Sequence, residues 1–194
     1  MTDEAVVAAP ATARRRRRRR LAPLIALVAV AVLAPFIVVL AGGQPAVDRF
    51  AKSPLLGKPA PALQGNTIDG TVFRLADHKG TWVVVNFFAP WCTGCRQEHP
   101  ALISFSAQHQ VSADAELVGV IFNDTPDNVR AFRRDLGGDW PLVIDPNGSV
   151  GVDYGVSALP ETFVIDPSGY VRAKFSSPVS AAGLNRVLDS LRSP

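Results

Sequence analysis

Apolar runs of strand length recur along the chain after residue 55 and predict a sheet. They are rich in β-branched and aromatic residues and lie at 81–88, 116–122, 142–144, 162–165 and 170–175. The first two are nearly continuous, which is typical of central strands buried on both faces. The last two flank Asp166-Pro167-Ser168-Gly169, a turn sequence that predicts a hairpin.

Three segments between and after these runs carry helical signals. A helix is expected from residue 92 to about Gln110, broken or bent at Pro100 because proline cannot donate the hydrogen bond required inside a helix. A second helix is expected over 124–136, with apolar residues at helical spacing before a Gly-Gly pair. A third, over 181–191, closes the chain.

A short hairpin is expected ahead of the main sheet. Segment 59–73 holds two small apolar pieces around the turn signals Gly65-Asn66 and Asp69-Gly70. The order of all these elements predicts an α/β sandwich, in which a central mixed sheet is flanked by helices. Residues 55–194 are enough for one domain of common size.

The N-terminal part has a different pattern, which predicts a membrane segment. Arg14–Arg20 is an unbroken run of arginine, and residues 21–40 after it carry no charge. As a helix this apolar stretch would be about 30 Å long, which matches the hydrocarbon thickness of a bilayer. The arginines should stay cytoplasmic by the positive-inside rule, so the rest of the chain is expected outside.

This pattern divides the chain into four expected parts. They are a cytoplasmic Arg-rich arm (1–20), a transmembrane anchor or signal segment (21–41), a tether (42–54) and the folded domain (55–194). We expect a single-pass protein of the cell membrane, although a cleaved signal also fits, since Val39-Leu40-Ala41 is a passable cleavage site. The adjoining apolar stretch argues against the arginine run binding nucleic acid.

The candidate chemistry lies in Trp91-Cys92-Thr93-Gly94-Cys95, which holds both cysteines of the chain and follows the first strand. At the first turn of a helix, free amide hydrogens and the helix dipole favour a thiolate. Cys92 is therefore expected to attack disulfides. Cys95, one turn further, is expected to attack the resulting mixed disulfide and release the partner.

Two other readings of the cysteine pair are weaker. A structural disulfide closing so short a loop would remove little entropy from the unfolded chain. A zinc site would need two further ligands, and the histidines, His78, His99 and His109, show no ligand spacing. We therefore expect neither a metal nor a cofactor.

The cysteine motif, together with Leu159-Pro160-Glu161-Thr162 downstream, resembles the thioredoxin superfamily. Within it, the membrane-tethered TlpA, ResA and CcmG (DsbE) type is most similar, on three further segments. These are Leu55 to Pro61, Arg96-Gln97-Glu98-His99-Pro100 and Pro160 to Asp166. The resemblance implies a thioredoxin-like fold and thiol-disulfide exchange, with Cys92 as the attacking cysteine.

The resemblance also implies roles for residues around the pair. Pro160 would follow a cis peptide bond, and Leu159 before it would pair with the backbone of a partner protein. Trp91 would pack beside the cysteines and contribute to substrate binding. Glu98 lies three residues beyond Cys95 on the same helical face, so it is a candidate for mediating proton movement, the alternative being a solvated helix residue.

Asn86 is a departure from thioredoxins proper, which carry a buried aspartate at this position beneath the cysteines. An amide cannot accept a proton from Cys95, so Glu98 or water is the expected acceptor. The alternative for Asn86 is a hydrogen bond to the backbone. This departure predicts a more selective enzyme than a general thioredoxin.

The expected function is thiol-disulfide exchange with exported proteins. The resemblance implies reduction, for example of the haem-binding cysteines of apocytochrome c, with a membrane electron-transfer protein restoring the pair. An oxidant that installs disulfides is the first alternative, because Thr93-Gly94 does not reveal the reduction potential. A peroxiredoxin-like peroxidase and a copper-handling protein are further alternatives, although the peroxidase signature and the copper-site cysteine spacing are absent.

Overall fold

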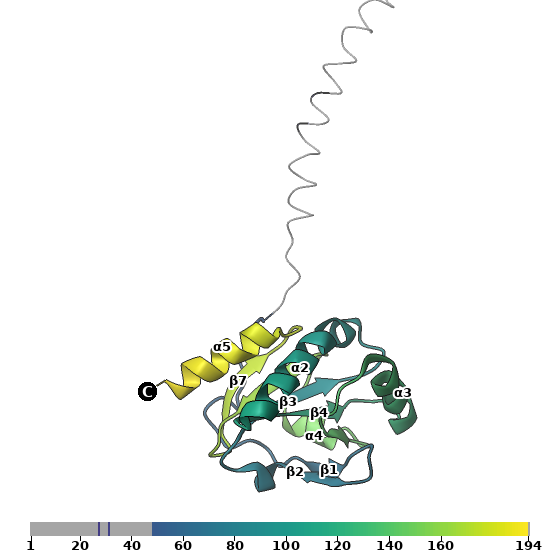
Figure 1. The fold of residues 1–194 in the computed structure, drawn as a ribbon, viewed down its shortest axis with the longest axis horizontal. Helices are drawn as coiled ribbons and strands as arrows, with labels where there is room; N and C mark the ends of the chain where they lie inside the picture. The colour runs from purple at the N-terminus through teal and green to yellow at the C-terminus, as the bar shows by residue number, and fades with distance from the viewer. Residues whose placement is uncertain (1–26, 28–30, 32–47, 194) are drawn as a thin grey trace, which may run out of the picture. The chain divides into compact units, whose positions relative to one another are not determined.

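The computed structural model describes residues 27, 31 and 48–193 (Figure 1). The strands are Gln64–Asn66 (β1), Val72–Arg74 (β2), Trp82–Phe88 (β3), Ala115–Ile121 (β4), Leu142–Ile144 (β5), Glu161–Ile165 (β6) and Val171–Phe175 (β7). The helices are Leu75–His78 (η1, a 3-10 turn), Thr93–Ser112 (α2), Pro126–Leu136 (α3), Ser149–Asp153 (α4) and Ala181–Arg192 (α5).

Five strands form a mixed sheet in the order β5-β4-β3-β6-β7. The pairs β3/β4 and β4/β5 are parallel, whereas β3/β6 and β6/β7 are antiparallel. β3 is the middle strand and all seven of its residues are buried. The strands β1 and β2 form a separate two-stranded antiparallel sheet, within the segment expected to be a hairpin. The mixed α/β sheet confirms the predicted thioredoxin-like fold class.

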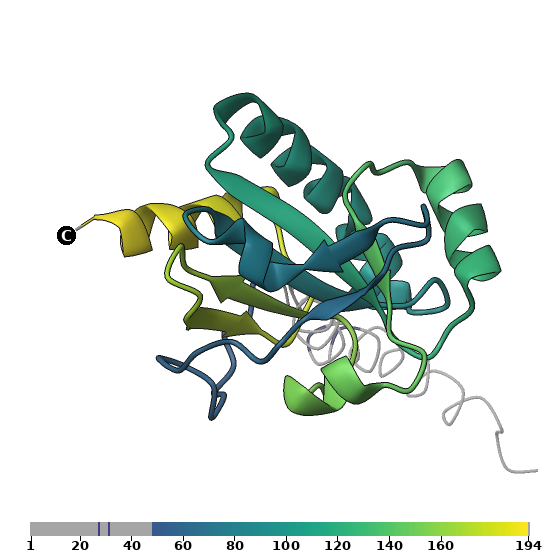
Figure 2. The ribbon, with the colours of Figure 1, turned by 90° about the horizontal axis from the view of Figure 1, so that it is seen from below.

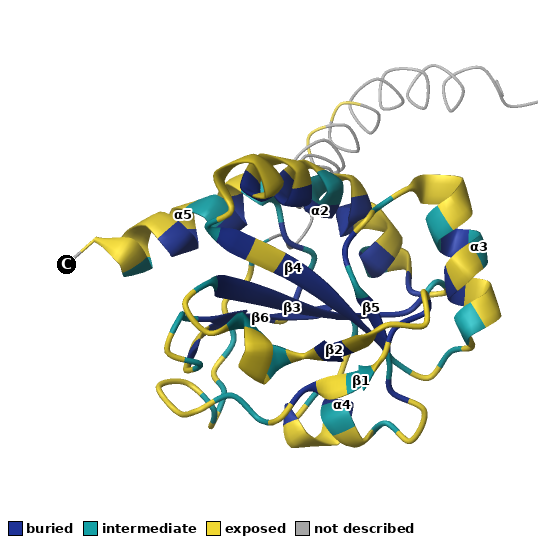
Figure 3. Cartoon of the chain, turned by 60° about the horizontal axis from the view of Figure 1, so that its bottom comes forward, coloured by how far each residue is buried: buried dark blue, intermediate teal, exposed yellow. Residues whose placement is uncertain are grey.

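The two faces of the main sheet are covered by different elements. One hydrophobic core packs side chains of α2, α3 and α5 against residues such as Val84 and Phe88 of β3. The other packs the β1–β2 pair and Tyr154, at the end of α4, against Val85 and Phe87. Figure 2 shows α4 on the opposite side of the sheet from α2, and Figure 3 shows that the strands between the layers are buried almost throughout.

The strand order brings the two conspicuous sequence motifs together. Cys92 follows the C-terminal end of β3, where the chain turns into α2. Pro160 immediately precedes β6, which pairs antiparallel with β3 so that Glu161 lies opposite Phe87. The start of one strand and the end of its neighbour therefore lie at the same edge of the sheet, and both motifs lie there.

Helix α2 differs from the prediction at Pro100. The helix is continuous from Thr93 to Ser112, so a break at Pro100 is wrong, and its C-terminus lies two residues beyond the expected Gln110. Pro100 is exposed, so its ring faces solvent, and the Ser104 hydroxyl donates a hydrogen bond to its carbonyl. Packing of the buried face of α2 against the sheet outweighs the one missing backbone hydrogen bond.

Part of the segment expected as a tether lies against the domain. The amide of Ala51 donates to the Lys174 carbonyl (2.9 Å), and the amide of Ser176 donates to the Arg49 carbonyl (3.0 Å). The rings of Phe50 and Phe175 are 4.7 Å apart. Residues 48–51 thus run along the outer edge of β7.

The other N-terminal predictions fall on residues outside the described part of the chain. Of the expected apolar segment 21–40, only Leu27 and Ala31 are described, and the arginine run is not described at all. Among the residues that the structure does describe, no helix combines the length and apolarity needed to cross a membrane.

Candidate active site

Cys92 and Cys95 form a disulfide, with their Cα atoms 5.2 Å apart. Cys92 is the N-cap of α2, and its sulfur accepts a hydrogen bond from the amide of Cys95 (3.1 Å). That amide and the positive end of the helix dipole would stabilise a thiolate on Cys92 in the reduced protein. In the disulfide form Cys92 is 6% exposed and Cys95 2%, so both sulfurs lie beneath the surface.

The peptide bond between Leu159 and Pro160 is cis, which confirms the conformation expected from the resemblance. Pro160 packs directly against the cysteine loop. A Cβ added to Gly94, between the two cysteines, would lie 2.9 Å from Pro160 Cδ and 3.3 Å from Pro178 Cγ. Only a glycine lets the two proline rings approach α2 this closely. The rings of Pro160 and Pro178 therefore cover the cysteine loop at Gly94.

Trp91 is 60% exposed, beside the largely buried disulfide. Its ring is therefore available at the surface for contact with another molecule. Leu159 is partly buried and packs against both hydrophobic cores. The three residues predicted to bind substrate thus gather around the cysteine pair.

Behind the disulfide, three buried polar side chains are joined by hydrogen bonds. Asn86 of β3 donates through Nδ2 to Oε1 of Glu98 (2.7 Å) and to Oγ1 of Thr162 (2.9 Å). The second carboxylate oxygen of Glu98 accepts from the amide of Val179 (2.8 Å). Asn86 therefore binds side chains, and its expected alternative, a hydrogen bond to the backbone, is wrong.

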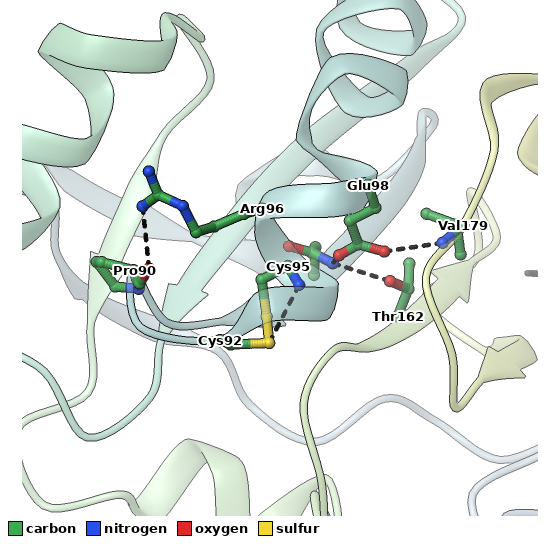
Figure 4. Close-up of a disulfide and its surroundings, with 8 residues drawn as sticks. Pro90, Cys92, Cys95, Arg96, Glu98, Thr162 and Val179 are labelled. Carbon is green, nitrogen blue, oxygen red and sulfur yellow. Dashed lines mark hydrogen bonds between the residues drawn. A yellow bond between two sulfur atoms is a disulfide. The ribbon is translucent and has the colours of Figure 1, made fainter. Parts of the chain in front are cut away.

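Glu98 is 2% exposed, so the alternative of a solvated helix residue is also wrong. Burial raises the pKa of its carboxyl to about 7 from an ordinary 4.5, and the hydrogen bonds from Val179 and Asn86 only partly oppose this rise. Its carboxylate is directed towards Asn86 and Val179 rather than towards sulfur (Figure 4). Glu98 is an acid that can take or give a proton near neutral pH, one helical turn from Cys95.

The other flank of the disulfide carries a cation and an imidazole. Arg96 Nη1 donates to the Pro90 carbonyl (3.2 Å), so its guanidinium points away from the sulfurs (Figure 4). His99 Nε2 lies 3.0 Å from the Gly137 carbonyl. Because a carbonyl oxygen can only accept, His99 donates to it through Nε2, and burial lowers the pKa of the ring, which favours its neutral form. The Arg96 charge is therefore directed away from Cys92.

Two parts of this arrangement were not apparent from the sequence. The Val179 amide is a backbone group, and backbone groups leave no signature in a residue pattern. Thr162 was noticed as part of a motif, but its contact with Asn86 depends on the β3–β6 register. The cysteines and Glu98, in contrast, were marked by residue type and spacing, and the cis-proline by the resemblance to the thioredoxin superfamily.

The fold and the cysteine loop define a thioredoxin-like protein with a redox-active disulfide. Comparison with known proteins agrees: residues 56–174 match the AhpC/TSA family. The chain is 35% identical over 140 residues to the thiol:disulfide interchange protein HelX of Rhodobacter capsulatus, covering 71% of this chain and 77% of that one. It is 30% identical to the thiol-disulfide oxidoreductase ResA of Geobacillus thermodenitrificans, covering 71% and 78%.

Solved structures give the same result. A thiol:disulfide interchange protein of Chlorobium tepidum superposes with a TM-score of 0.63 at 29% identity, over 72% of this chain and 98% of that one. A DsbF homologue of Corynebacterium diphtheriae gives 0.63 at 26% identity, over 73% and 91%. The chain belongs to the AhpC/TSA family and is a thiol-disulfide oxidoreductase of the DsbE and ResA type, which acts on protein thiols or disulfides.

Proposed function

We propose that the protein is a reductant of exported proteins, with the haem-binding cysteines of apocytochrome c as its substrate class. The observation that supports this direction is the environment of Cys92 Sγ. In the described part of the chain the one hydrogen bond that Cys92 Sγ accepts comes from the Cys95 amide, and the Arg96 guanidinium is bonded to the Pro90 carbonyl instead. A single amide donor stabilises the Cys92 thiolate less than several donors would, and a less stabilised thiolate makes the reduced pair a stronger reductant.

The reaction consists of two displacements. The Cys92 thiolate attacks one sulfur of a substrate disulfide, which forms a mixed disulfide and releases the other substrate sulfur as a thiolate. Cys95 then loses its proton and attacks Cys92 Sγ, which releases the second substrate thiolate and forms the Cys92–Cys95 disulfide. The substrate gains two electrons and the protein loses two, which a membrane electron-transfer protein would restore.

Glu98 is proposed as the group that accepts the Cys95 proton. Its pKa of about 7 suits a base that works near neutral pH, and no side chain on β3 replaces it, because Asn86 cannot accept a proton. The supporting geometry is its burial beside Asn86, which lines the same small cavity as Cys95.

Residues 21–40 are proposed as the membrane anchor that holds the domain outside the cytoplasm. The support is the sequence alone: an uncharged apolar stretch that follows seven consecutive arginines. Trp91, Leu159 and Pro160 would contact the substrate, and Leu159 would pair with an extended segment of its backbone.

Redox equilibration of the full chain with glutathione tests the direction. A reductant should have a reduction potential near that of thioredoxin, about −270 mV, whereas an oxidant that installs disulfides should lie near −120 mV, roughly the value for DsbA. Trp91, beside the pair, offers a fluorescence signal for the titration. A potential near the upper value would replace this proposal with the oxidant alternative.

A further inference from the structure

Asp48 lies far from the cysteines in the sequence but is bonded to the loop that contacts Glu98. Its Oδ1 accepts from the Ser180 amide (2.7 Å) and its Oδ2 from the Ser180 hydroxyl (2.6 Å). Its own amide donates to the Pro178 carbonyl (2.9 Å). Three hydrogen bonds from one residue thus hold the two residues that flank Val179.

Val179 is the residue of that loop that reaches the active site. Its amide donates to Glu98 Oε2 (2.8 Å), and both residues are 2% exposed. The preceding residue, Pro178, packs over Gly94 between the cysteines. The position of this loop therefore decides whether a buried carboxylate keeps one of its two hydrogen-bond donors.

The contact between Asp48 and the start of α5 leaves no spare room. A Cβ on Gly183 would lie 2.2 to 2.4 Å from the carboxyl atoms of Asp48. The side chain is only 18% exposed, and Arg186 Nη2 approaches Oδ2 at 3.5 Å from the solvent side. A side chain of the same length and shape is needed to make both side-chain hydrogen bonds to Ser180 at once.

We propose that Asp48 is a positioning residue for the active site: by holding Pro178 and Ser180, it keeps the Val179 amide on Glu98. The inference rests on the proposed role of Glu98 in accepting the Cys95 proton. Asp48 itself touches neither sulfur nor substrate. It acts only through the loop.

Loss of the hydrogen bond from Val179 should change the pKa of Glu98 in a known direction. The bond stabilises the charged form of Glu98 and so lowers its pKa, against the larger effect of burial. If the loop relaxes, the pKa of Glu98 should rise above about 7. The base would then become available only at higher pH.

Within the described residues, no charged side chain is bonded to the Glu98 carboxylate. The groups bonded to its carboxylate, from β3 and the loop, are neutral. The titratable and charged side chains of α2, β6, β7 and α5 nearest to it are bonded elsewhere, apart from Cys95: His99 to Gly137, Glu161 and Lys174 to each other, and Arg186 to Asp48. A shift in the Glu98 titration therefore reports its hydrogen bonds.

The test follows Cys95 directly in the reduced full-length chain. An aromatic disulfide such as 5,5′-dithiobis(2-nitrobenzoic acid) reacts with Cys92 and releases one coloured thiolate. Attack of Cys95 on the mixed disulfide then releases a second. The rate of the second release, measured from pH 5 to 9, should rise with a midpoint near 7 in the wild type, because Glu98 must be deprotonated to act as a base.

Three substitutions separate charge from geometry. Asp48→Ala should move the midpoint to higher pH by roughly half to one unit, since a charge-assisted hydrogen bond is weakened. Asp48→Asn keeps the shape and an acceptor oxygen, so it should retain the wild-type midpoint. Asp48→Glu keeps the charge but does not fit against Gly183, so it should shift like Asp48→Ala. If Asp48→Ala fails to fold, the comparison of Asp48→Asn with Asp48→Glu still tests the proposal.

Two further variants distinguish the possible failures. Arg186→Ala removes only the exposed contact and should leave the midpoint unchanged. Glu98→Gln should abolish the transition near pH 7; a wild-type profile in that variant would overturn the role of Glu98 and the inference with it. If Glu98→Gln abolishes the transition but Asp48→Glu leaves the midpoint in place, the role of Asp48 alone is refuted.

Discussion

At the scale of single residues, Glu98 links the chemistry of the site to the stability of the fold. Its pKa of about 7 in the folded protein lies above the ordinary 4.5, so the folded state binds more protons between these values. The free energy of unfolding should therefore lose a contribution as pH rises from 4.5 to 7, by about 3 kcal/mol in all. At pH 8 the charged carboxylate persists only because Asn86 and Val179 donate to it.

Glu98→Gln should remove this dependence. Urea unfolding of both proteins from pH 4.5 to 8 should show a difference in stability that changes by about 3 kcal/mol in favour of the variant as pH rises. Taking the difference cancels the opposite contribution of His99, whose lowered pKa costs stability at acidic pH. A difference that stays constant with pH would show that Glu98 does not titrate in this range.

Gly94 is the second residue on which the site depends. In Gly94→Ala the new Cβ would lie 2.9 Å from the Pro160 ring, which cannot rotate away. The helix would gain about 1 kcal/mol in propensity, but overpacking costs about 1 to 3 kcal/mol, so we expect a net loss of stability. Displacement of Pro160 should lower kcat/KM for a protein disulfide roughly 10-fold or more.

A matched substitution tells this steric effect from a change in the cysteines themselves. Thr93→Ala alters the exposed neighbouring residue, adds no atom near Pro160, and should keep wild-type activity. A small disulfide needs little of the docking surface, so Gly94→Ala should reduce it at close to the normal rate. Equal losses with both substrates would contradict the steric explanation.

At the scale of elements, a buried ion pair joins β6 to β7 next to the cis-proline. Lys174 Nζ lies 2.8 Å from Glu161 Oε2, with the side chains 8% and 3% exposed. Lys174→Met should destabilise the domain by about 3 to 5 kcal/mol, because Glu161 would be left as an uncompensated buried charge. Chemical denaturation measures this directly.

The charge mechanism predicts the behaviour of two related variants. Glu161→Leu added to Lys174→Met should restore most of the lost stability, since no charge is then buried. Arg172→Ala breaks a pair between Arg172 of β7, whose side chain is 46% exposed, and Asp166 in the turn before that strand, and should cost less than about 1 kcal/mol. If the double variant were no more stable than Lys174→Met, lost packing rather than charge would be responsible.

The long elements were predictable because a single feature dominates each of them. Strand β3 is a continuous β-branched and aromatic run, and Pro126 with Thr125 marks the start of α3, where the Thr125 hydroxyl accepts from the Asn128 amide. Helix α4 was missed because five residues are too few to show a period, and it has no side-chain cap. Continuity through Pro100 was missed because it depends on tertiary packing.

The residues of the active site also differ in whether the sequence could predict them. Cys92 and Cys95 were identifiable because their residue type and spacing are needed for a specific chemistry, and Pro160 because the motif around it resembles the thioredoxin superfamily. The contacts of Asp48 were not, since they join residues 132 positions apart through an edge that the sequence pattern does not specify. A residue that acts through hydrogen bonds to a distant part of the backbone can be identified only from the three-dimensional structure.

At the scale of the whole molecule, the described domain explains exchange chemistry but not where it takes place. That question depends on the N-terminal sequence, in which seven of the 20 Lys and Arg residues of the chain are consecutive. Because charge bias next to an apolar segment sets its orientation, the arginine run should keep the N-terminus cytoplasmic and Cys92 on the other side.

This topology can be tested without introducing further cysteines, since Cys92 and Cys95 are the two cysteines of the chain. After mild reduction, a membrane-impermeant maleimide should label the full-length protein in right-side-out vesicles and not in inverted ones. Replacing Arg14–Arg20 with serine should give a mixture of both orientations, because the charge bias is then lost.

Alkaline extraction should leave the wild type in the membrane if residues 21–40 are retained as an anchor. Release on extraction, with a new N-terminus near Ala41, would instead identify a cleaved signal, and labelling confined to inverted vesicles would place the exchange chemistry in the cytoplasm.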